Sequence, residues 1–66
     1  MTKWVLCSER LPKEHKNYLC SVEFKQEKFV TEWEYNPYYK EWNDGDTFGY
    51  KVIAWMELPK PYGEAE

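Results

Sequence analysis

The side chains that could serve as a nucleophile or a base are few and lie far apart along the chain. Cys7 and Cys20 are the two thiols, and His15 is the single imidazole. A cysteine nucleophile needs a base within hydrogen-bond reach and a pocket that excludes water. His15 stands between Glu14 and Lys16, which is typical of a solvated loop. We therefore predict that the protein is not an enzyme.

A second candidate site is a short polar stretch in the last third of the chain. Asn43, Asp44 and Asp46 offer side-chain oxygens of the kind that bind Ca²⁺. However, no glutamate stands where the known calcium loop needs its bidentate ligand. The Asp-Gly pair at 44–45 instead favours a tight turn. We expect a turn here, with no metal and no cofactor.

Residues 31–46 combine acidic and aromatic side chains. This stretch holds five carboxylates against the single Lys40. Such a surface suits a basic protein partner, because carboxylates steer the encounter and aromatic rings become buried anchors. In the alternative, the carboxylates form the wet face of a sheet and the rings point inward, which period-two alternation favours for Trp33 and Tyr35. The predicted contact residues are Tyr38, Tyr39, Glu41, Trp42, Asp44 and Asp46.

Two other kinds of ligand remain open. A small ligand such as a nucleotide could stack between rings if lysine or arginine side chains converge on it from elsewhere in the fold. Single-stranded nucleic acid could stack on the same rings, but it requires a basic groove that residues 31–46 lack. Self-association is a further alternative, since exposed edge strands pair readily and a small domain gains stability from an oligomer.

Composition limits the class of protein. The 66 residues make one domain, 1–66, with 9 basic and 12 acidic residues and a net charge of -3. This balance disfavours duplex DNA as a partner. No stretch reaches the roughly 18 apolar residues that cross a membrane, and no signal peptide is expected. We therefore predict a cytoplasmic protein with reduced cysteines. Its 20% aromatic content exceeds what so small a core can bury. The surplus indicates a binding surface or, in the alternative, tyrosines that bury their rings and keep their hydroxyl groups in solvent.

The elements that position these side chains are mostly strands. Apolar and polar residues alternate with period two over 18–24 and again over 29–35, which predicts two strands joined by a charged tip at 25–28. A shorter third strand is expected over 38–42. The last strand is expected over 50–56, where the alternation is less regular.

The remaining segments complete a small fold. Residues 4–7 form a short apolar run, a single turn is expected near residues 8–11, and residues 62–66 are predicted to form a frayed tail. We predict an α+β or mostly β single domain with a three- to four-stranded antiparallel sheet. At most a short helical turn is expected, near residues 8–11.

Both ends of the chain carry a family resemblance. Trp4 followed by Arg10-Leu11-Pro12, with the closing segment Trp55-Met56-Glu57-Leu58-Pro59-Lys60-Pro61, resembles the domain of unknown function 551 family. The chain departs from the usual closing pattern, with Glu57 where a second proline is common and with Tyr62 after Pro61. The resemblance supplies no catalytic residues. It implies a small accessory protein of a phage or prophage, acting in a bacterial cytoplasm.

These observations lead to one functional hypothesis. The protein is expected to be a non-catalytic accessory factor that binds and modulates a host protein through the acidic and aromatic residues of 38–46. A host defence factor is one candidate partner. A membrane and duplex nucleic acid are not expected as partners.

Overall fold

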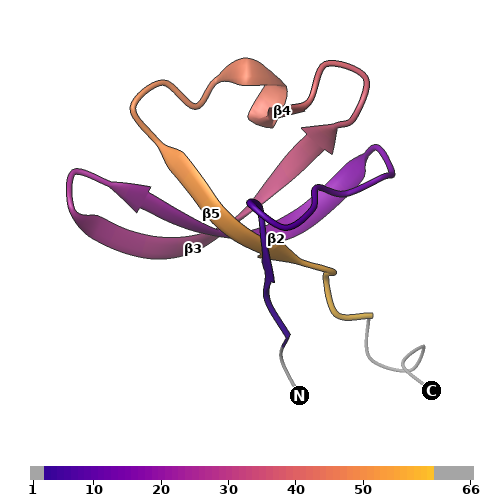
Figure 1. Cartoon of the computed structure of the whole chain (residues 1–66), viewed down its shortest axis with the longest axis horizontal. Helices are drawn as coiled ribbons and strands as arrows, with labels where there is room; N and C mark the ends of the chain where they lie inside the picture. The colour runs from indigo at the N-terminus through magenta and orange to yellow at the C-terminus, as the bar shows by residue number, and fades with distance from the viewer. Residues whose placement is uncertain (1–2, 61–66) are drawn as a thin grey trace.

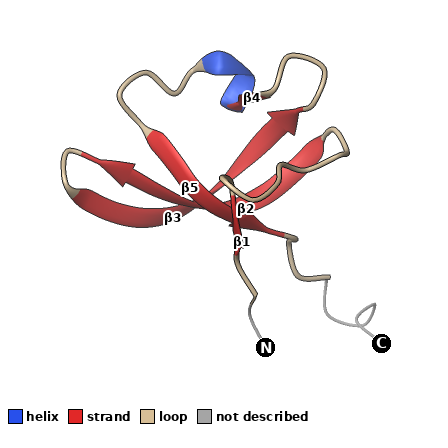
Figure 2. Ribbon diagram, viewed as in Figure 1, coloured by secondary structure: helices blue, strands red, loops and turns tan. Residues whose placement is uncertain are grey.

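The structure is a computed structural model that describes residues 3–60. One five-stranded antiparallel sheet, in the order β1-β5-β2-β3-β4, forms the whole domain (Figures 1 and 2). The elements are β1 (Val5–Leu6), β2 (Lys16–Phe24), β3 (Glu27–Asn36), β4 (Glu41–Trp42), the 3₁₀ turn η1 (Asn43–Gly45) and β5 (Lys51–Met56). The prediction of a small, mostly β antiparallel domain is confirmed. The sheet has five strands because two-residue strands lie at both of its edges. The predicted tail at 62–66 lies outside the described residues.

The central hairpin follows the alternation of the sequence. β2 pairs with β3 so that Tyr18 faces Trp33 and Cys20 faces Thr31. These residues share one side of the sheet, which we call the inner face, and the intervening residues lie on the outer face. The connecting loop contains only Lys25 and Gln26, whose φ angles are 51° and 69°. Two positive φ angles are typical of the turn that matches the twist of a tight hairpin.

β5 lies between β1 and β2, and its irregular alternation has a structural cause. Ser21 pairs with Ala54, whereas Val22 pairs with Val52, so Ile53 is an extra residue that forms a β-bulge. The Ile53 carbonyl accepts a hydrogen bond from the Cys7 N–H at 2.9 Å. The bulge therefore interrupts the period-two pattern of β5 at Ile53, the residue whose carbonyl accepts the hydrogen bond from Cys7.

The predicted strand over 38–42 is wrong for most of its length. Only Glu41 and Trp42 pair with β3, opposite Asn36 and Tyr35. The Asn36 side chain redirects the backbone, because its Oδ1 accepts hydrogen bonds from the N–H groups of the two residues at 38 and 39. Lys40 then has a φ of 58°, which a strand does not allow.

The single turn predicted near residues 8–11 is confirmed. Near residues 8–11 the chain makes a hydrogen-bonded turn, in which the N–H groups of Glu9 and Arg10 both donate to the Leu6 carbonyl. The 3₁₀ turn of the described residues is η1, at 43–45. The predicted turn is therefore present as one hydrogen-bonded turn after β1, and the 3₁₀ turn at 43–45 is an additional element.

The core lies on the inner face, beneath the segment that arches from β3 to β5 (Figure 1). Tyr18, Tyr35 and Trp55 form its buried cluster, and Trp42 packs against it from β4. The Tyr18 and Trp55 rings meet edge to face with centroids 5.1 Å apart. Cys20 is fully buried on the same face. Large aromatic rings thus supply the apolar burial that so short a chain needs.

Candidate functional site

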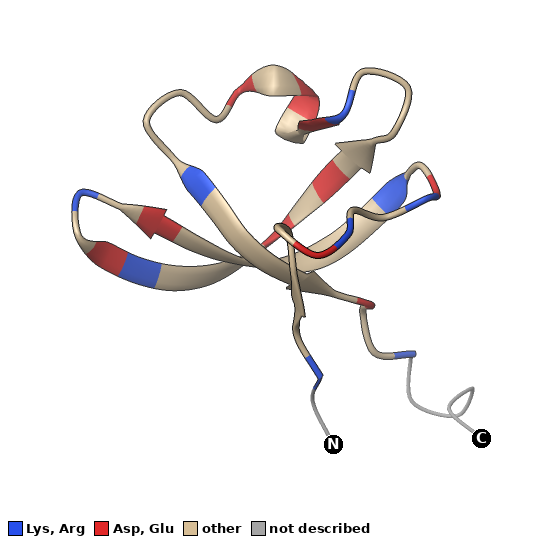
Figure 3. Ribbon diagram, in the orientation of Figure 1, with Lys and Arg blue, Asp and Glu red and all other residues tan. Residues whose placement is uncertain are grey.

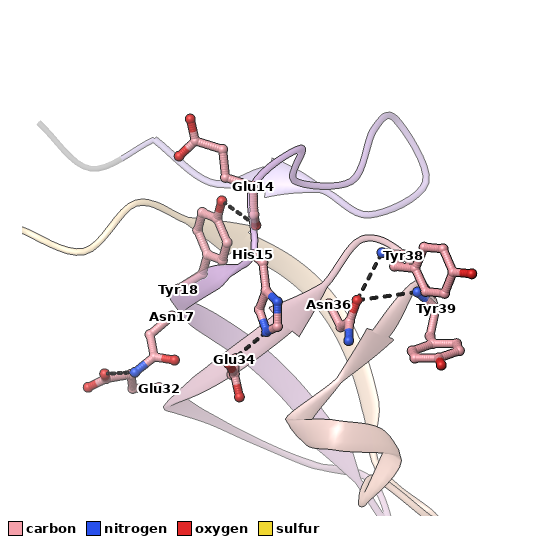
Figure 4. A network of polar contacts seen from close by, with 9 residues as sticks. All are labelled: Glu14, His15, Asn17, Tyr18, Glu32, Glu34, Asn36, Tyr38 and Tyr39. Atoms are coloured by element: carbon pink, nitrogen blue, oxygen red, sulfur yellow. Dashed lines mark hydrogen bonds and ion pairs between the residues drawn. The ribbon is translucent and has the colours of Figure 1, made fainter.

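Two tyrosines project from the arch into solvent. Tyr38 and Tyr39 are 82% and 65% exposed, and their rings meet edge to face at 4.8 Å. The Asn36 Oδ1 accepts the Tyr38 N–H at 2.9 Å and the Tyr39 N–H at 3.3 Å. Figure 4 shows both rings on the far side of this turn from the β2–β3 contacts. The backbone is therefore fixed where the two exposed rings leave it.

Three carboxylates follow the tyrosines on the same segment. Glu41, Asp44 and Asp46 are all exposed, and acidic residues surround η1 in Figure 3. The turn is compact, because the Asn43 backbone carbonyl accepts the Asp46 N–H at 2.9 Å and the Asn43 side-chain amide donates to the Asp46 backbone carbonyl at 3.0 Å. Lys40 is the single basic residue in this segment. The exposed tyrosines and these carboxylates, residues 38, 39, 41, 44 and 46, form what we call the acidic aromatic surface.

Trp42, the remaining predicted contact residue, is directed toward the core. It lies opposite Tyr35 in the pairing of β4 with β3, and its ring is 4.6 Å from the Tyr35 ring and 6.2 Å from the Tyr18 ring. Trp42 is therefore half-buried, and its main contacts are within the domain. The sequence left open which rings of 33–42 face solvent. Trp33 and Tyr35 pack on the inner face, as their alternation indicates.

The residues with potential for catalysis have structural partners. His15 Nε2 lies 2.7 Å from Glu34 Oε2 in an exposed pair (Figure 4). Burial raises the pKa of Cys20 to about 12 and also raises the pKa of Cys7, so both thiols stay protonated at neutral pH. Within residues 3–60, no cluster of three or more histidine, cysteine or acidic side chains could hold a metal ion. No helix in this range is long and apolar enough to span a membrane.

A basic hollow lies at the other end of the inner-face core, where the polar loop before β2 meets β5. Its volume is about 480 Å³, and its lining residues include Arg10, Lys13, Lys16, Tyr18 and Trp55. The Trp55 Nε1–H donates to the Arg10 carbonyl at 3.0 Å, which fixes one wall. The hollow is not among the sites that the sequence predicts. The three basic residues at intervals of three were its only signal in the sequence.

Two acidic side chains moderate the charge of the hollow. Lys16 Nζ lies 2.9 Å from Glu57 Oε1 and 3.5 Å from Glu14 Oε1. The hydrogen bond to Glu57 raises the pKa of Lys16. Lys16 is thus already paired, and Arg10 and Lys13 are the basic groups of the hollow with no ion pair among the described residues.

A third feature is an open aromatic cluster near the hairpin turn. Tyr50 stacks on Phe24 at 4.3 Å, and the edges of Phe29 and Trp33 meet its ring. Beside it, Phe48 is almost fully exposed. The sequence does not predict this cluster, because its rings converge only where the arch returns to β5.

The fold and these surfaces define a small antiparallel β domain with exposed aromatic and charged groups. The chain belongs to the family described as Protein of unknown function (DUF551), whose model matches residues 3–62. The resemblance drawn from Trp4, residues 10–12 and the closing segment is thereby confirmed. Comparison with curated proteins and with solved structures gave no significant match.

Proposed function

We propose that this protein is a non-catalytic binding protein whose acidic aromatic surface engages a basic protein partner. The observation that carries the proposal is the exposed pair Tyr38 and Tyr39, held at the backbone by Asn36. Tyrosine has only two side-chain torsions, so it buries a large area at low entropic cost when a partner covers it. A fixed backbone lowers that cost further.

The carboxylates make this surface prefer a basic partner. Glu41, Asp44 and Asp46 lie next to the tyrosines on one segment, with Lys40 as the only opposing charge there. Exposed carboxylates attract a basic surface over about one Debye length, roughly 10 Å at 0.1 M salt. They therefore raise the association rate, while the tyrosine rings supply most of the contact energy.

The biological setting of the proposal comes from the family resemblance. In that setting the protein is an accessory factor of a phage or prophage, and its partner is a host protein in the bacterial cytoplasm. Binding would modulate the activity of that host protein, and a defence factor is one candidate. The domain would act by occupying a surface of its partner, without chemistry of its own.

A site-specific photo-crosslinker tests direct contact. Benzoylphenylalanine placed at Tyr38 should crosslink one protein in bacterial lysate. The same probe at Phe48, an equally accessible ring outside the surface, should not crosslink that protein. Equal crosslinking from both positions, or none from either, would remove the support for this surface.

Affinity measurements on the captured partner then test the energetics. The double variant Tyr38→Ala, Tyr39→Ala should bind at least about tenfold more weakly, because hot-spot rings contribute more than 1 kcal/mol each. Phe48→Ala is the matched control and should bind as the wild type does. Trp42→Ala is unsuitable here, because its loss would also disturb the core.

A second candidate function rests on the basic hollow. Its volume lies in the range of small-molecule sites, and Tyr18 and Trp55 line it together with Arg10 and Lys13. This combination favours an anionic small ligand such as a nucleotide. Thermal unfolding with and without ATP would test it. Stabilisation that Lys13→Ala abolishes and Lys25→Ala preserves would support this candidate, and no stabilisation of the wild type would count against it.

Single-stranded nucleic acid is the third candidate ligand. Binding through lysine and arginine contacts to phosphates would weaken steeply as salt rises, because bound counterions are released. Titration of a labelled oligonucleotide at two salt concentrations separates this candidate from nucleotide binding. An affinity that is independent of salt would contradict it.

A further inference from the structure

The outer face of the sheet carries an apolar band in register across four strands. Leu6 pairs with Ala54, Ala54 with Ser21, and Ser21 with Val30, so the four residues form one row from β1 to β3. Leu6 is 45% exposed and Val30 is 58% exposed. Large apolar side chains at the two ends of this row thus flank two small residues at its centre.

The next row along the strands adds two larger apolar side chains. Met56 pairs with Leu19, and both are only partly buried, whereas the exposed Glu32 completes this row on β3. Within residues 3–60, no helix or second sheet is present to cover this face. On β5 and β2, the small residues Ala54, which is buried, and Ser21 therefore lie beside the larger Met56 and Leu19.

Charges of opposite sign lie on the two sides of this band. On the side of the hairpin turn, Lys28 and Lys51 pair with Glu23 between them. On the opposite side, Glu32 and Glu34 follow one another along β3. Both carboxylates have a neighbour in the sheet or the loop before it: the Asn17 side-chain amide donates to Glu32 at 2.8 Å, and His15 Nε2 lies 2.7 Å from Glu34 Oε2. The outer face is thus basic on one side of its apolar band and acidic on the other.

We propose that a second copy of this chain covers the outer face in a symmetric, face-to-face dimer. The two-fold axis would lie between the two sheets and run perpendicular to their strands, midway between the row of Ser21 and the row of Leu19. This axis places Leu19 and Met56 of each protomer over Ser21 and Ala54 of its partner, so that large side chains meet small ones. Packed sheets lie about 10 Å apart, a spacing that this alternation of size allows.

The same axis also brings the opposite charges together. Lys28 and Glu34 lie at equal distances on either side of it along β3, so Lys28 of each protomer faces Glu34 of its partner. In such an isologous interface each contact occurs twice, and a face with one basic and one acidic side is complementary to itself. This self-complementarity selects a second copy rather than a partner with a single charge sign. The acidic aromatic surface lies on the arch over the inner face, so the dimer leaves it free.

Charge reversal with cross-pairing tests the dimer. Sedimentation of the wild type from about 1 μM to about 1 mM should show a monomer–dimer equilibrium. Lys28→Glu alone and Glu34→Lys alone should each weaken dimerisation at least about tenfold, because each places like charges opposite one another twice. An equimolar mixture of the two variants should dimerise again, since every facing pair is then of opposite sign.

Controls separate this outcome from loss of the fold. Lys25→Glu makes the same charge change in the hairpin turn and should dimerise like the wild type. Val30→Glu should prevent dimerisation, because the axis places residue 30 of each protomer over Glu32 of its partner and like charges would then meet twice. Circular dichroism should show an unchanged sheet in this variant. A wild type that stays monomeric throughout, or a mixture that fails to dimerise when both variants are folded, would overturn the proposal.

Discussion

At the scale of single residues, Trp55 joins the two ends of the chain that carry the family resemblance. Its indole N–H donates to the Arg10 carbonyl, and its ring packs on Tyr18 in the core. Trp55→Phe removes the donor and part of the ring. We expect the free energy of unfolding to fall by about 1–3 kcal/mol, because the Arg10 carbonyl loses its partner in a part-buried site. Urea denaturation measures this change.

The control for that prediction is Trp4→Phe. Trp4 is exposed and makes no side-chain hydrogen bond among the described residues, so the same chemical change should have little effect there. Equal destabilisation by both substitutions would contradict the role given to the indole hydrogen bond.

Cys20 makes the stability of the fold sensitive to alkaline pH. Burial raises its pKa from 9.0 to about 12. A group whose pKa is higher in the folded state stabilises the fold below its unfolded pKa and loses that contribution as pH rises. Stability should therefore fall between about pH 9 and pH 12, by up to about 1.4 kcal/mol per pH unit from this thiol.

Denaturation at pH 7 and pH 10 checks this prediction. Cys20→Ala should show a smaller loss between the two pH values than the wild type does. Burial also raises the pKa values of Cys7, Tyr18 and Tyr35, so some alkaline loss should remain. An identical pH dependence in Cys20→Ala would show that the buried thiol is not its source.

At the scale of elements, the turn between β2 and β3 uses residues that suit it poorly. Lys25 and Gln26 both have positive φ angles, which cost a residue with a Cβ roughly 1 kcal/mol or more. Replacing them with Asn-Gly supplies the pair that this turn prefers. We expect a gain of about 1 kcal/mol in the free energy of unfolding, measured by thermal and urea denaturation.

A lysine contact offsets part of this gain. Lys25 Nζ lies 5.3 Å from the centre of the Phe24 ring, a cation–π contact that the substitution removes. Lys25→Ala isolates that loss and serves as the control. If the Asn-Gly variant were no more stable than Lys25→Ala, the strain of the turn would not lower the stability of the domain.

Two glycines of the arch allow a matched comparison. Gly45 and Gly49 both have a φ of 83°, so alanine is strained equally at either position. A Cβ at Gly49 would lie 2.9 Å from the Phe24 ring, which Tyr50 holds by stacking. The atoms nearest to a Cβ at Gly45 would be those of the exposed Glu41 carboxylate, the closest at 3.2 Å.

Gly49→Ala should therefore destabilise the domain more than Gly45→Ala does. The backbone strain costs about 1 kcal/mol in both variants, and the clash with Phe24 adds to it only at Gly49. Thermal denaturation of the two variants measures the difference. Equal melting temperatures would mean that the Phe24 ring moves aside freely.

The sequence predicts the central hairpin well and the arch poorly, for a physical reason. Residues 18–24 and 29–35 alternate because one face is buried and the other is wet, and this pattern is local. The third predicted strand starts later than expected, at Glu41, because one side-chain hydrogen-bond acceptor, Asn36, holds residues 38 and 39 in a turn. An alternation pattern carries no information about that bond.

The sequence likewise predicts some residues of the candidate site to be exposed and misses the long-range contacts of others. Tyr38 and Tyr39 are exposed because the Asn36 turn removes them from the sheet, so their prediction as surface residues rests on a feature that the pattern misses. Trp42 is half-buried because β4 resumes pairing opposite Tyr35. The basic hollow requires β5 to lie beside the loop before β2, a long-range pairing that spacing alone cannot specify.

At the scale of the whole molecule, the proposed dimer should couple stability to concentration. A partner that binds only the folded state stabilises it by mass action. The melting temperature of the wild type should rise by roughly 3 °C for each tenfold increase in protein concentration. Val30→Glu should melt at a temperature independent of concentration, and a flat response of the wild type would contradict the dimer.

The order of strands also determines when the domain can acquire its shape during synthesis. β5 comes after the other four strands in the chain, yet it inserts between β1 and β2. The β2–β3 hairpin forms from neighbouring residues within microseconds. β5 must close a much longer loop, and its contacts offset the conformational entropy lost in closing that loop only after it has paired. A ribosome that has released only β1 to β4 therefore presents a hairpin whose aromatic side lacks Trp55. Such an intermediate would attract chaperones or other nascent chains until residue 56 emerges.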